Sequence, residues 1–233
     1  LPIFNFDTEN KVNDYRSAAK YASRAIKLNK ESSKAWSALA LVYRELRLRD
    51  KMVNAAAKAI QLKPAEYEAY DLLADAYAGD FFPEFKNLDS AIFFRKKSVG
   101  IEPKFAAGYR GIGADYLQKG DLVNAEAMFR KALELNSKHA GSHDGLGQVY
   151  YRKGDLENAK QEFLQTITLD SRSTFGYSHL GDALFMEGNF REAYLKYTTA
   201  IELNPNAAYT YYRLAWMYLS AKDESFRDPG KAL

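Results

Sequence analysis

The chain has 233 residues, is 47% hydrophobic and 14% aromatic, and carries a formal net charge of +3. A chain of this size and composition can bury a large core. It contains no cysteine, which excludes disulfide bonds, thiolate catalysis and cysteine ligands for metals. No apolar run is long enough for a membrane-spanning helix, and so small a net charge does not indicate nucleic acid as a partner.

Charge is distributed unevenly along the chain. Residues 1–63 hold 13 Lys or Arg against 6 Asp or Glu, whereas residues 64–233 hold 20 against 24. We interpret this as a solvated surface whose charge differs between regions.

Residues 1–32 predict an N-terminal segment followed by half a repeat. Residues 1–12 lack helical periodicity, whereas residues 13–28 carry apolar residues at i, i+4 and i+7 and are expected to form a helix. Residues 33–66 predict a full pair of helices. Met52 stands where later pairs have alanine, which predicts looser packing at that point.

Residues 67–105 predict a second helix pair with a longer turn. Its second helix is expected to begin near Asp89, and the segment 79–87 accounts for five residues more than the corresponding turns later in the chain.

Residues 106–207 contain three tandem copies of one sequence repeat, at 106–139, 140–173 and 174–207. Gly120, Gly154 and Gly188 stand 34 residues apart. Small and aromatic residues recur in register after each glycine: Ala125, Ala159 and Ala193; Phe129, Phe163 and Tyr197; Ala132, Thr166 and Ala200. A fixed period of this length predicts stacked pairs of antiparallel helices.

The turn within each of these three units is predicted from its residue types. Glycine accepts the left-handed conformation that ends a first helix, and Asp121 and Asp155 are placed to cap the second helix. The small residues of the first helices are expected to face those of the second, as Gly147 would face Ala159.

Residues 208–233 predict a partial sixth repeat. Ala208 opens a first helix, and Phe226–Asp228 stands before Ala232 as Phe85–Asn87 stands before Ala91. Asp228 and Pro229 then predict the cap and first turn of a helix that the chain cuts off. Together with the lack of an initiating Met, this predicts a piece of a longer protein.

These recurring residues resemble the tetratricopeptide repeat family. The resemblance implies an all-α fold, a right-handed superhelical solenoid of antiparallel helix pairs, because no pair can bury its apolar faces alone. It also implies a concave groove lined by first helices, in which ligands lie. Two subtypes of the family are excluded. Chaperone-binding members bind the C-terminal carboxylate of their ligand with side chains at fixed groove positions, and two of these positions hold Ala38 and Leu41 here. The row of asparagines found in sugar-transferase members is absent.

The sequence offers little chemistry. His139 and His143 are four residues apart, which could place two metal ligands together, but His143 occupies the position of Tyr109 and Tyr177 and is better interpreted as core. No phosphate-binding loop, activated serine or pair of catalytic carboxylates is present. We therefore predict no enzyme activity, no cofactor and no metal.

The predicted site is the groove. Small residues are expected to line the floor of the groove in its middle, at Gly111, Ala114, Gly141 and Gly145. Aromatic residues are expected to line its walls toward the C-terminus. A small floor would let a ligand backbone approach closely, or it would only permit tight stacking; both interpretations stay open. The candidate contact residues are Arg110, Asp144, Gln148, Tyr151, Arg152, His179, Asp182, Phe185, Tyr209, Tyr212, Arg213 and Trp216.

The sequence therefore predicts a scaffold that binds a peptide or partner segment in the groove. Because Arg152 and Arg213 lie near Asp144 and Asp182, the segment is expected to be mixed in charge. The alternatives are a recognition or regulatory module of a larger protein and an array that self-associates through its ends. No nucleic acid or membrane insertion is expected. The identity of the partner stays open, and so does whether the groove or the Phe81–Phe85 loop is the main contact. The expected location is cytoplasmic by default, with the periplasm as an alternative.

Overall fold

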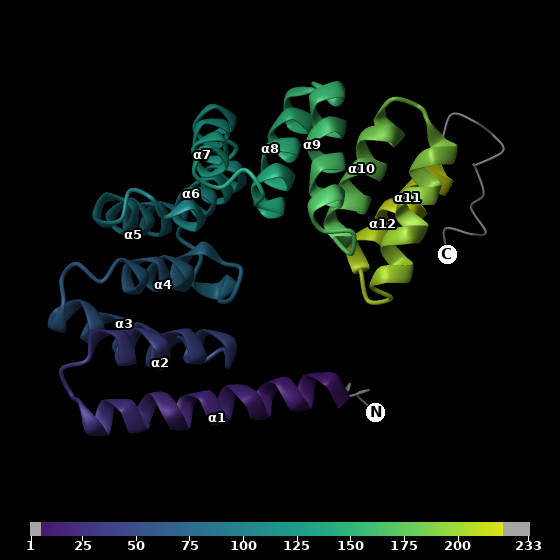
Figure 1. Cartoon of the computed structure of the whole chain (residues 1–233). Coiled ribbons are helices and arrows are strands. Elements are labelled where there is room, and N and C mark those ends of the chain that lie inside the picture. Colours follow the sequence, from purple (N-terminus) through teal and green to yellow (C-terminus); the bar gives the residue numbers. More distant parts are fainter. Residues whose placement is uncertain (1–5, 221–233) are drawn as a thin grey trace. The chain divides into compact units, whose positions relative to one another are not determined.

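The computed structural model describes residues 6–220, with side chains described from residue 13. Within that part of the chain it contains twelve α-helices, one short 3-10 helix and no strand (Figure 1). The α-helices are α1 (Phe6–Leu28), α2 (Ser33–Glu45), α3 (Arg49–Leu62), α4 (Tyr67–Ala78), α5 (Leu88–Ile101), α6 (Ala106–Lys119), α7 (Leu122–Leu135), α8 (Ala140–Lys153), α9 (Leu156–Leu169), α10 (Thr174–Met186), α11 (Phe190–Leu203) and α12 (Ala208–Ser220).

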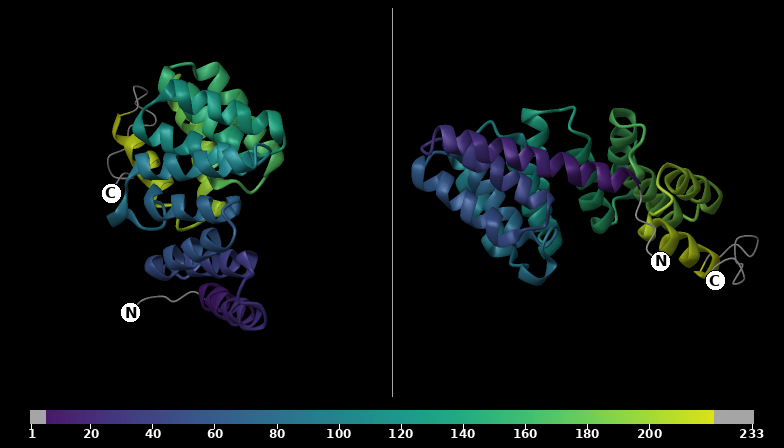
Figure 2. Two further views of the ribbon diagram at one scale, coloured as in Figure 1. Left: turned by 90° about the vertical axis from the view of Figure 1, so that its left-hand side faces the viewer. Right: turned by 90° about the horizontal axis from the view of Figure 1, so that it is seen from below.

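The chain divides into two compact units, unit 1 (Leu1–Lys119) and unit 2 (Gly120–Leu233). In unit 1 each helix from α1 to α6 packs against the next, and α1 lies beside α2 in the views of Figures 1 and 2. In unit 2 the same holds from α7 to α12. The division falls inside the predicted repeat 106–139.

The turns follow the predicted glycine chemistry, with one exception. Gly120, Gly154 and Gly188 have φ of 79°, 79° and 84°, the left-handed region that glycine enters without steric cost. The exception is Arg47, which has φ 58° at the corresponding point before α3. Its guanidinium Nη1 donates to the carbonyls of Asp80 and Phe81, at 3.2 and 2.8 Å, which helps to hold this less favourable conformation.

Helix starts also match the predicted capping. The carboxylates of Asp121 and Asp155 accept hydrogen bonds from the backbone N–H of Asn124 and Asn158, at 3.1 and 3.2 Å. These contacts satisfy donors that would otherwise lack a partner in the first turn.

The structure corrects the prediction at the N-terminus. Helix α1 begins at Phe6, so the segment 6–12, which was expected to be non-helical, is part of it. Polar residues do not by themselves end a helix, because only glycine and proline carry a large propensity penalty. The predicted cap at Asp228 and Pro229 lies outside the described residues.

The longer turn of 79–87 is an ordered part of unit 1. Gly79 ends α4 with φ 91°, the 3-10 helix η1 (Pro83–Phe85) follows, and Asn87 caps α5 by accepting from the N–H of Ser90 at 3.0 Å. Phe82 is buried against the core, and Met52 is fully buried in the same cluster. The expected loosening at Met52 is therefore wrong, since a flexible methionine fills the space that smaller residues would leave.

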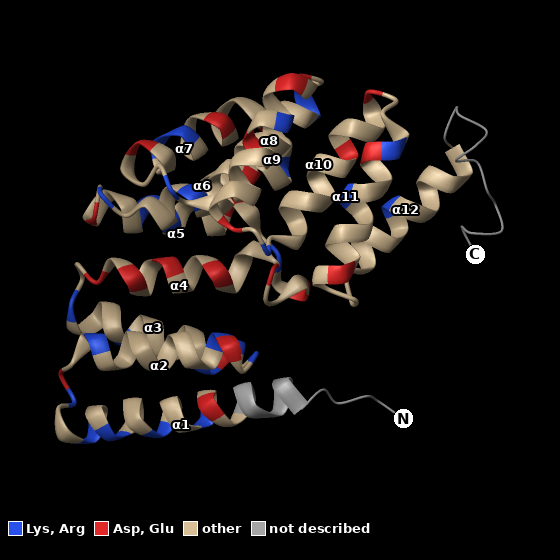
Figure 3. Cartoon of the chain, turned by 45° about the vertical axis from the view of Figure 1, so that its right-hand side comes forward, with Lys and Arg blue, Asp and Glu red and all other residues tan. Residues whose placement is uncertain are grey.

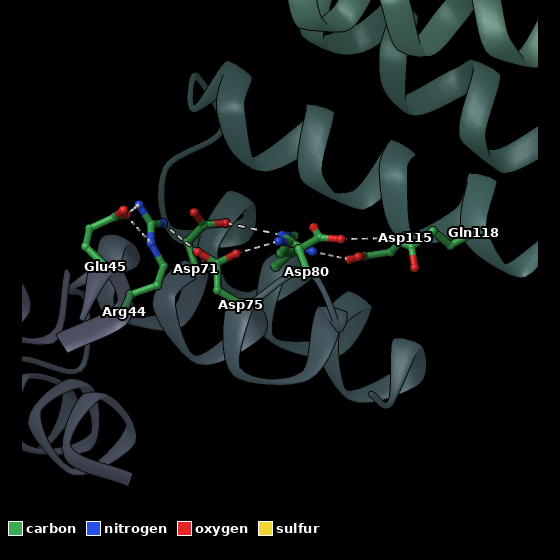
Figure 4. A network of polar contacts seen from close by, with 8 residues as sticks. Arg44, Glu45, Asp71, Asp75, Asp80, Asp115 and Gln118 are labelled. Carbon is green, nitrogen blue, oxygen red and sulfur yellow. Dashed lines mark hydrogen bonds and ion pairs between the residues drawn. The ribbon is translucent and has the colours of Figure 1, made fainter. Parts of the chain in front are cut away.

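A buried ionic network joins four helices of unit 1 (Figure 4). Arg95 of α5 donates through Nη1 to Asp115 of α6 at 2.5 Å and through Nη2 to Asp75 of α4 at 2.7 Å. Asp75 also accepts from Nη1 of Arg44 in α2 at 2.6 Å. Burial raises the pKa of Asp115 to about 6, although the neighbouring Arg95 lowers it. A buried guanidinium is suited to this place because its planar fork can bind two carboxylates at once.

The side chain of Arg95 also explains why residue 111 is a glycine. A Cβ added at Gly111 would lie 2.4 Å from Nε of Arg95, and one added at Gly145 would lie 2.3 Å from the ring of Phe129. The small floor of the predicted groove at these two positions is therefore filled by the protein's own side chains. In the same way the ring of Phe163 lies nearest to Gly147, at 2.6 Å from its ideal Cβ, where Ala159 was expected.

Candidate partner-binding surface

Three first helices of unit 2, α8, α10 and α12, carry eleven of the twelve predicted contact residues. The twelfth, Arg110, lies on α6 in unit 1. On α12, Tyr209, Tyr212, Arg213 and Trp216 follow at i, i+3, i+4 and i+7, so they share one side of the helix. Because Tyr209 and Arg213 bind Asp182 of α10, that side of α12 is the one turned toward α10.

Asp182 is the polar centre of this surface. Its side chain is 4% exposed and accepts from the hydroxyl of Tyr197 at 2.7 Å, from Nε of Arg213 at 2.6 Å and from the hydroxyl of Tyr209. Burial, and then the Asp182 charge, raise the pKa of Tyr197 and of Tyr209, so both hydroxyls stay protonated and donate. Asp182 is therefore an internal anchor that ties α10 to α11 and α12.

A second polar contact ties α8 to α10. Nδ1 of His179 lies 2.7 Å from Oδ1 of Asp144, and Nε2 of Gln148 donates to Oδ2 of the same carboxylate at 2.8 Å. Burial lowers the pKa of His179, but the Asp144 carboxylate outweighs this and raises it above its usual value. Both acids of the predicted site thus have partners within the protein, which leaves less of each carboxylate available to a basic ligand residue.

Aromatic rings surround His179. Its ring centroid lies 5.4 Å from that of Phe163, 6.0 Å from that of Phe175 and 5.9 Å from that of Tyr209. A pocket of about 180 Å³ opens at this point. It is lined by Gln148, Tyr151, Arg152, Phe163, His179, Asp182 and Tyr209.

Exposed aromatic side chains lie on α12, where Tyr209 lines this pocket, and at the start of α10. Phe175, Tyr209, Tyr212 and Trp216 are 65, 44, 60 and 47% exposed. We call these four residues the aromatic face. A hollow of about 450 Å³ adjoins the pocket at Tyr209, where residues before and in α10 and α12 come together. Phe175 and Tyr209 line this hollow, and exposed apolar side chains that lie together are typical of interaction sites.

Phe185 plays a different part from the one predicted. Its ring packs 5.5 Å from that of Phe190 at the start of α11, and it is half-buried against the core of unit 2. It therefore supports α10 more than it presents itself to a ligand. Phe163 is almost fully buried, as are Phe129 and Tyr197 at the same repeat position, yet it also lines the pocket. The repeat spacing gives no signal for its contact with the ring of His179.

The two histidines considered for a metal have other contacts. Nδ1 of His139 accepts from the N–H of Ser142 at 3.1 Å and caps α8, while Nδ1 of His143 lies 2.6 Å from Glu162. Over the described residues, no group of three or more metal-ligating side chains comes together. Nor does any helix in the described part of the chain have the length and apolarity needed to cross a bilayer.

Comparison with known proteins agrees with this architecture. Three family models described as tetratricopeptide repeat match the chain, one at residues 10–64 and 111–173, which is just over half of it, and the others at 174–207 and 196–228. No curated protein matches the sequence.

Several solved structures are similar in fold. The Cut9–Hcn1 assembly of the APC/C matches with a TM-score of 0.80 at 17% identity, over 96% of this chain and 45% of that chain. PilF from Pseudomonas aeruginosa matches at 0.71 and 18%, over 87% and 88%. YrrB, described as a TPR protein with an unusual peptide-binding site, matches at 0.59 and 18%, over 83% and 97%.

The helix pairs, the glycine turns and these matches agree, and the fold is one that supports a protein–protein interaction scaffold. The chain belongs to the tetratricopeptide repeat family.

Proposed function

We propose that the chain is an interaction scaffold whose aromatic face binds a peptide segment of a partner protein, without chemistry of its own. The observation that carries the proposal is the exposure of Tyr209, Tyr212 and Trp216 along one side of α12, where Tyr209 also lines the pocket at His179. Tyrosine and tryptophan dominate binding energy at interfaces because they bury much apolar area at low entropic cost.

The contacts within the surface define the kind of segment. Asp144 and Asp182 already accept from internal donors, so they add little attraction for Lys or Arg. Tyr151 and Phe163 also line the pocket and give it apolar walls. We therefore revise the expected segment from one of mixed charge to one that is mainly apolar or aromatic.

YrrB, which shares the fold and is described as having a peptide-binding site, supports a peptide ligand in principle. Two features favour the aromatic face over the Phe81–Phe85 loop. Phe82 of that loop is buried, and the rings of Phe81 and Phe85 already stack against Arg47 and Arg49, whose guanidinium carbons lie 4.8 and 3.9 Å from the ring centroids, although Phe85 stays 44% exposed.

The test is a selection from a random peptide library on the whole chain, followed by titration of the selected peptides. Tyr212→Ala and Trp216→Ala should each weaken binding by about 2 kcal/mol, which is roughly thirtyfold in Kd. Tyr211→Ala is the matched control, because Tyr211 is 47% exposed on the same helix but points about 100° away from Tyr212. Parent-like binding by both variants, with loss in Phe85→Ala, would move the site to the loop.

A further inference from the structure

Helix α1 carries a row of positive side chains on its outer side. Residues 15–30 contain five Lys or Arg and no Asp or Glu. Arg16, Lys20, Arg24 and Lys27 follow at i, i+4, i+8 and i+11, which places them along one side of the helix. We call these four residues the basic stripe; Figure 3 shows the run of Lys and Arg along α1.

The basic stripe faces away from the rest of unit 1. All four residues are exposed, whereas Ala18, Ala22 and Ile26 are half-buried, and α1 packs against α2. Among the side chains that the structure describes, none of the four cations pairs with a carboxylate, in contrast to Arg44 and Arg95 in the same unit. The charge of the stripe is thus not balanced from within the described part of the chain.

Like charges at i, i+4 destabilise a helix, and the stripe contains two such pairs and a third at i, i+3. A helix face that serves only as a solvated surface would mix both signs and so avoid this cost. The excess of one sign therefore points to a ligand of the opposite sign.

The stripe is not purely polar. Tyr21 and Leu28 are each 75% exposed, and they flank Arg24 at i−3 and i+4. A hollow of about 450 Å³ lies among Lys20, Tyr21, Ser23, Arg24 and Lys27. A ligand that combines negative charges with apolar side chains would match both components.

We propose that the outer side of α1 binds an acidic amphipathic helix of a partner protein. Carboxylates at i, i+4 on that helix would pair with the basic stripe, as charged positions pair across two packed helices, while its apolar residues cover Tyr21 and Leu28. A single row of cations on one helix suits this geometry better than nucleic acid, which is bound by broader basic patches that follow the backbone.

The probe is a synthetic helical peptide as long as α1, with Glu along one stripe and Leu beside it, titrated against the whole chain by fluorescence anisotropy. Lys20→Glu/Lys27→Glu converts the stripe to alternating signs and should weaken binding by about tenfold or more. Lys51→Glu/Lys58→Glu changes the net charge equally at the same spacing on α3 and should bind like the parent. Replacing every Glu of the probe with Gln should abolish binding.

Because alternating signs favour a helix, the Lys20→Glu/Lys27→Glu variant should unfold at the same temperature as the parent or higher. A lower unfolding temperature would show that these lysines are needed within the fold, and the proposal would fail. It would also fail if both double variants lost affinity equally, or if the parent preferred a single-stranded polynucleotide to the acidic helix. Since the aromatic face plays no part in this assay, the result is independent of the function proposed above.

Discussion

Replacing Arg95 with methionine removes the side chain that joins α4, α5 and α6 in unit 1. Methionine keeps the unbranched apolar stem but leaves Asp115, which is 1% exposed, without the cation that binds it, and leaves Asp75, which is 7% exposed, with Arg44 alone. Breaking a buried ion pair by removing one partner costs about 3–5 kcal/mol, because the remaining charge is desolvated without compensation. Arg95→Met should therefore lower the stability of unit 1 by about that amount.

Arg95→Phe sharpens the test. Four residues after Ala91, Arg95 occupies the repeat position held by Phe129, Phe163 and Tyr197. If repeat position alone governed stability, phenylalanine would be tolerated there. The structure predicts a loss like that of Arg95→Met, since the two aspartates stay buried in both variants.

The assay is urea unfolding followed by tryptophan fluorescence. The chain has two tryptophans, Trp36 in unit 1 and Trp216 in unit 2, so a Trp216→Phe background makes Trp36 a reporter of unit 1. Adding Asp115→Leu to Arg95→Met should recover part of the loss, with a coupling of about 0.5–3 kcal/mol. A change below about 0.5 kcal/mol in Arg95→Met, the range of an ordinary surface substitution, would refute the reasoning.

Three further predictions concern packing and pH. Ala159→Leu should destabilise unit 2 by about 1–3 kcal/mol through overpacking at a fully buried position, and an unchanged urea midpoint would contradict this. Gly111→Ala should cost unit 1 a similar amount, because its Cβ meets the fixed Arg95; a more stable variant would show that Arg95 can move aside. Asp144 holds the pKa of His179 above its usual value despite burial, so the stability from this pair is complete below the unfolded pKa of about 6.5 and is lost as pH rises through the folded pKa. Thermal unfolding of the parent should therefore occur at lower temperature as pH rises through this range, and His179→Gln should reduce that slope; equal slopes would contradict the assignment.

The 34-residue repeat period predicts where the helices and the turns between them lie. Gly120, Gly154 and Gly188 sit where a first helix must stop, and the left-handed conformation at each follows from residue type alone. Arg47 shows the limit of this inference: no residue type at that position predicts a positive φ, which depends on its contacts with the carbonyls of Asp80 and Phe81.

The candidate site was harder to predict, because a repeat position does not say what a side chain meets on the next helix. Gly111 and Gly145 were equally consistent with a ligand and with tight stacking, and Arg95 and Phe129 decide for stacking. Asp182 was expected to contact the ligand, but its carboxylate accepts hydrogen bonds from partners on α11 and α12. The spacing places Tyr209, Tyr212 and Trp216 on one side of α12, and all three are exposed there, while their contact with a ligand stays a prediction.

Photo-crosslinking of a library-selected peptide tests the central claim most directly. A benzoylphenylalanine side chain replaces Tyr212 in one variant and Phe85 in another, positions that are 60% and 44% exposed and lie in different units. Tyr212→benzoylphenylalanine is predicted to capture the peptide, and mass spectrometry should locate the crosslink at residue 212, while Phe85→benzoylphenylalanine captures none above background. Capture at residue 85 with none at residue 212 would contradict the assignment of the aromatic face as the binding surface.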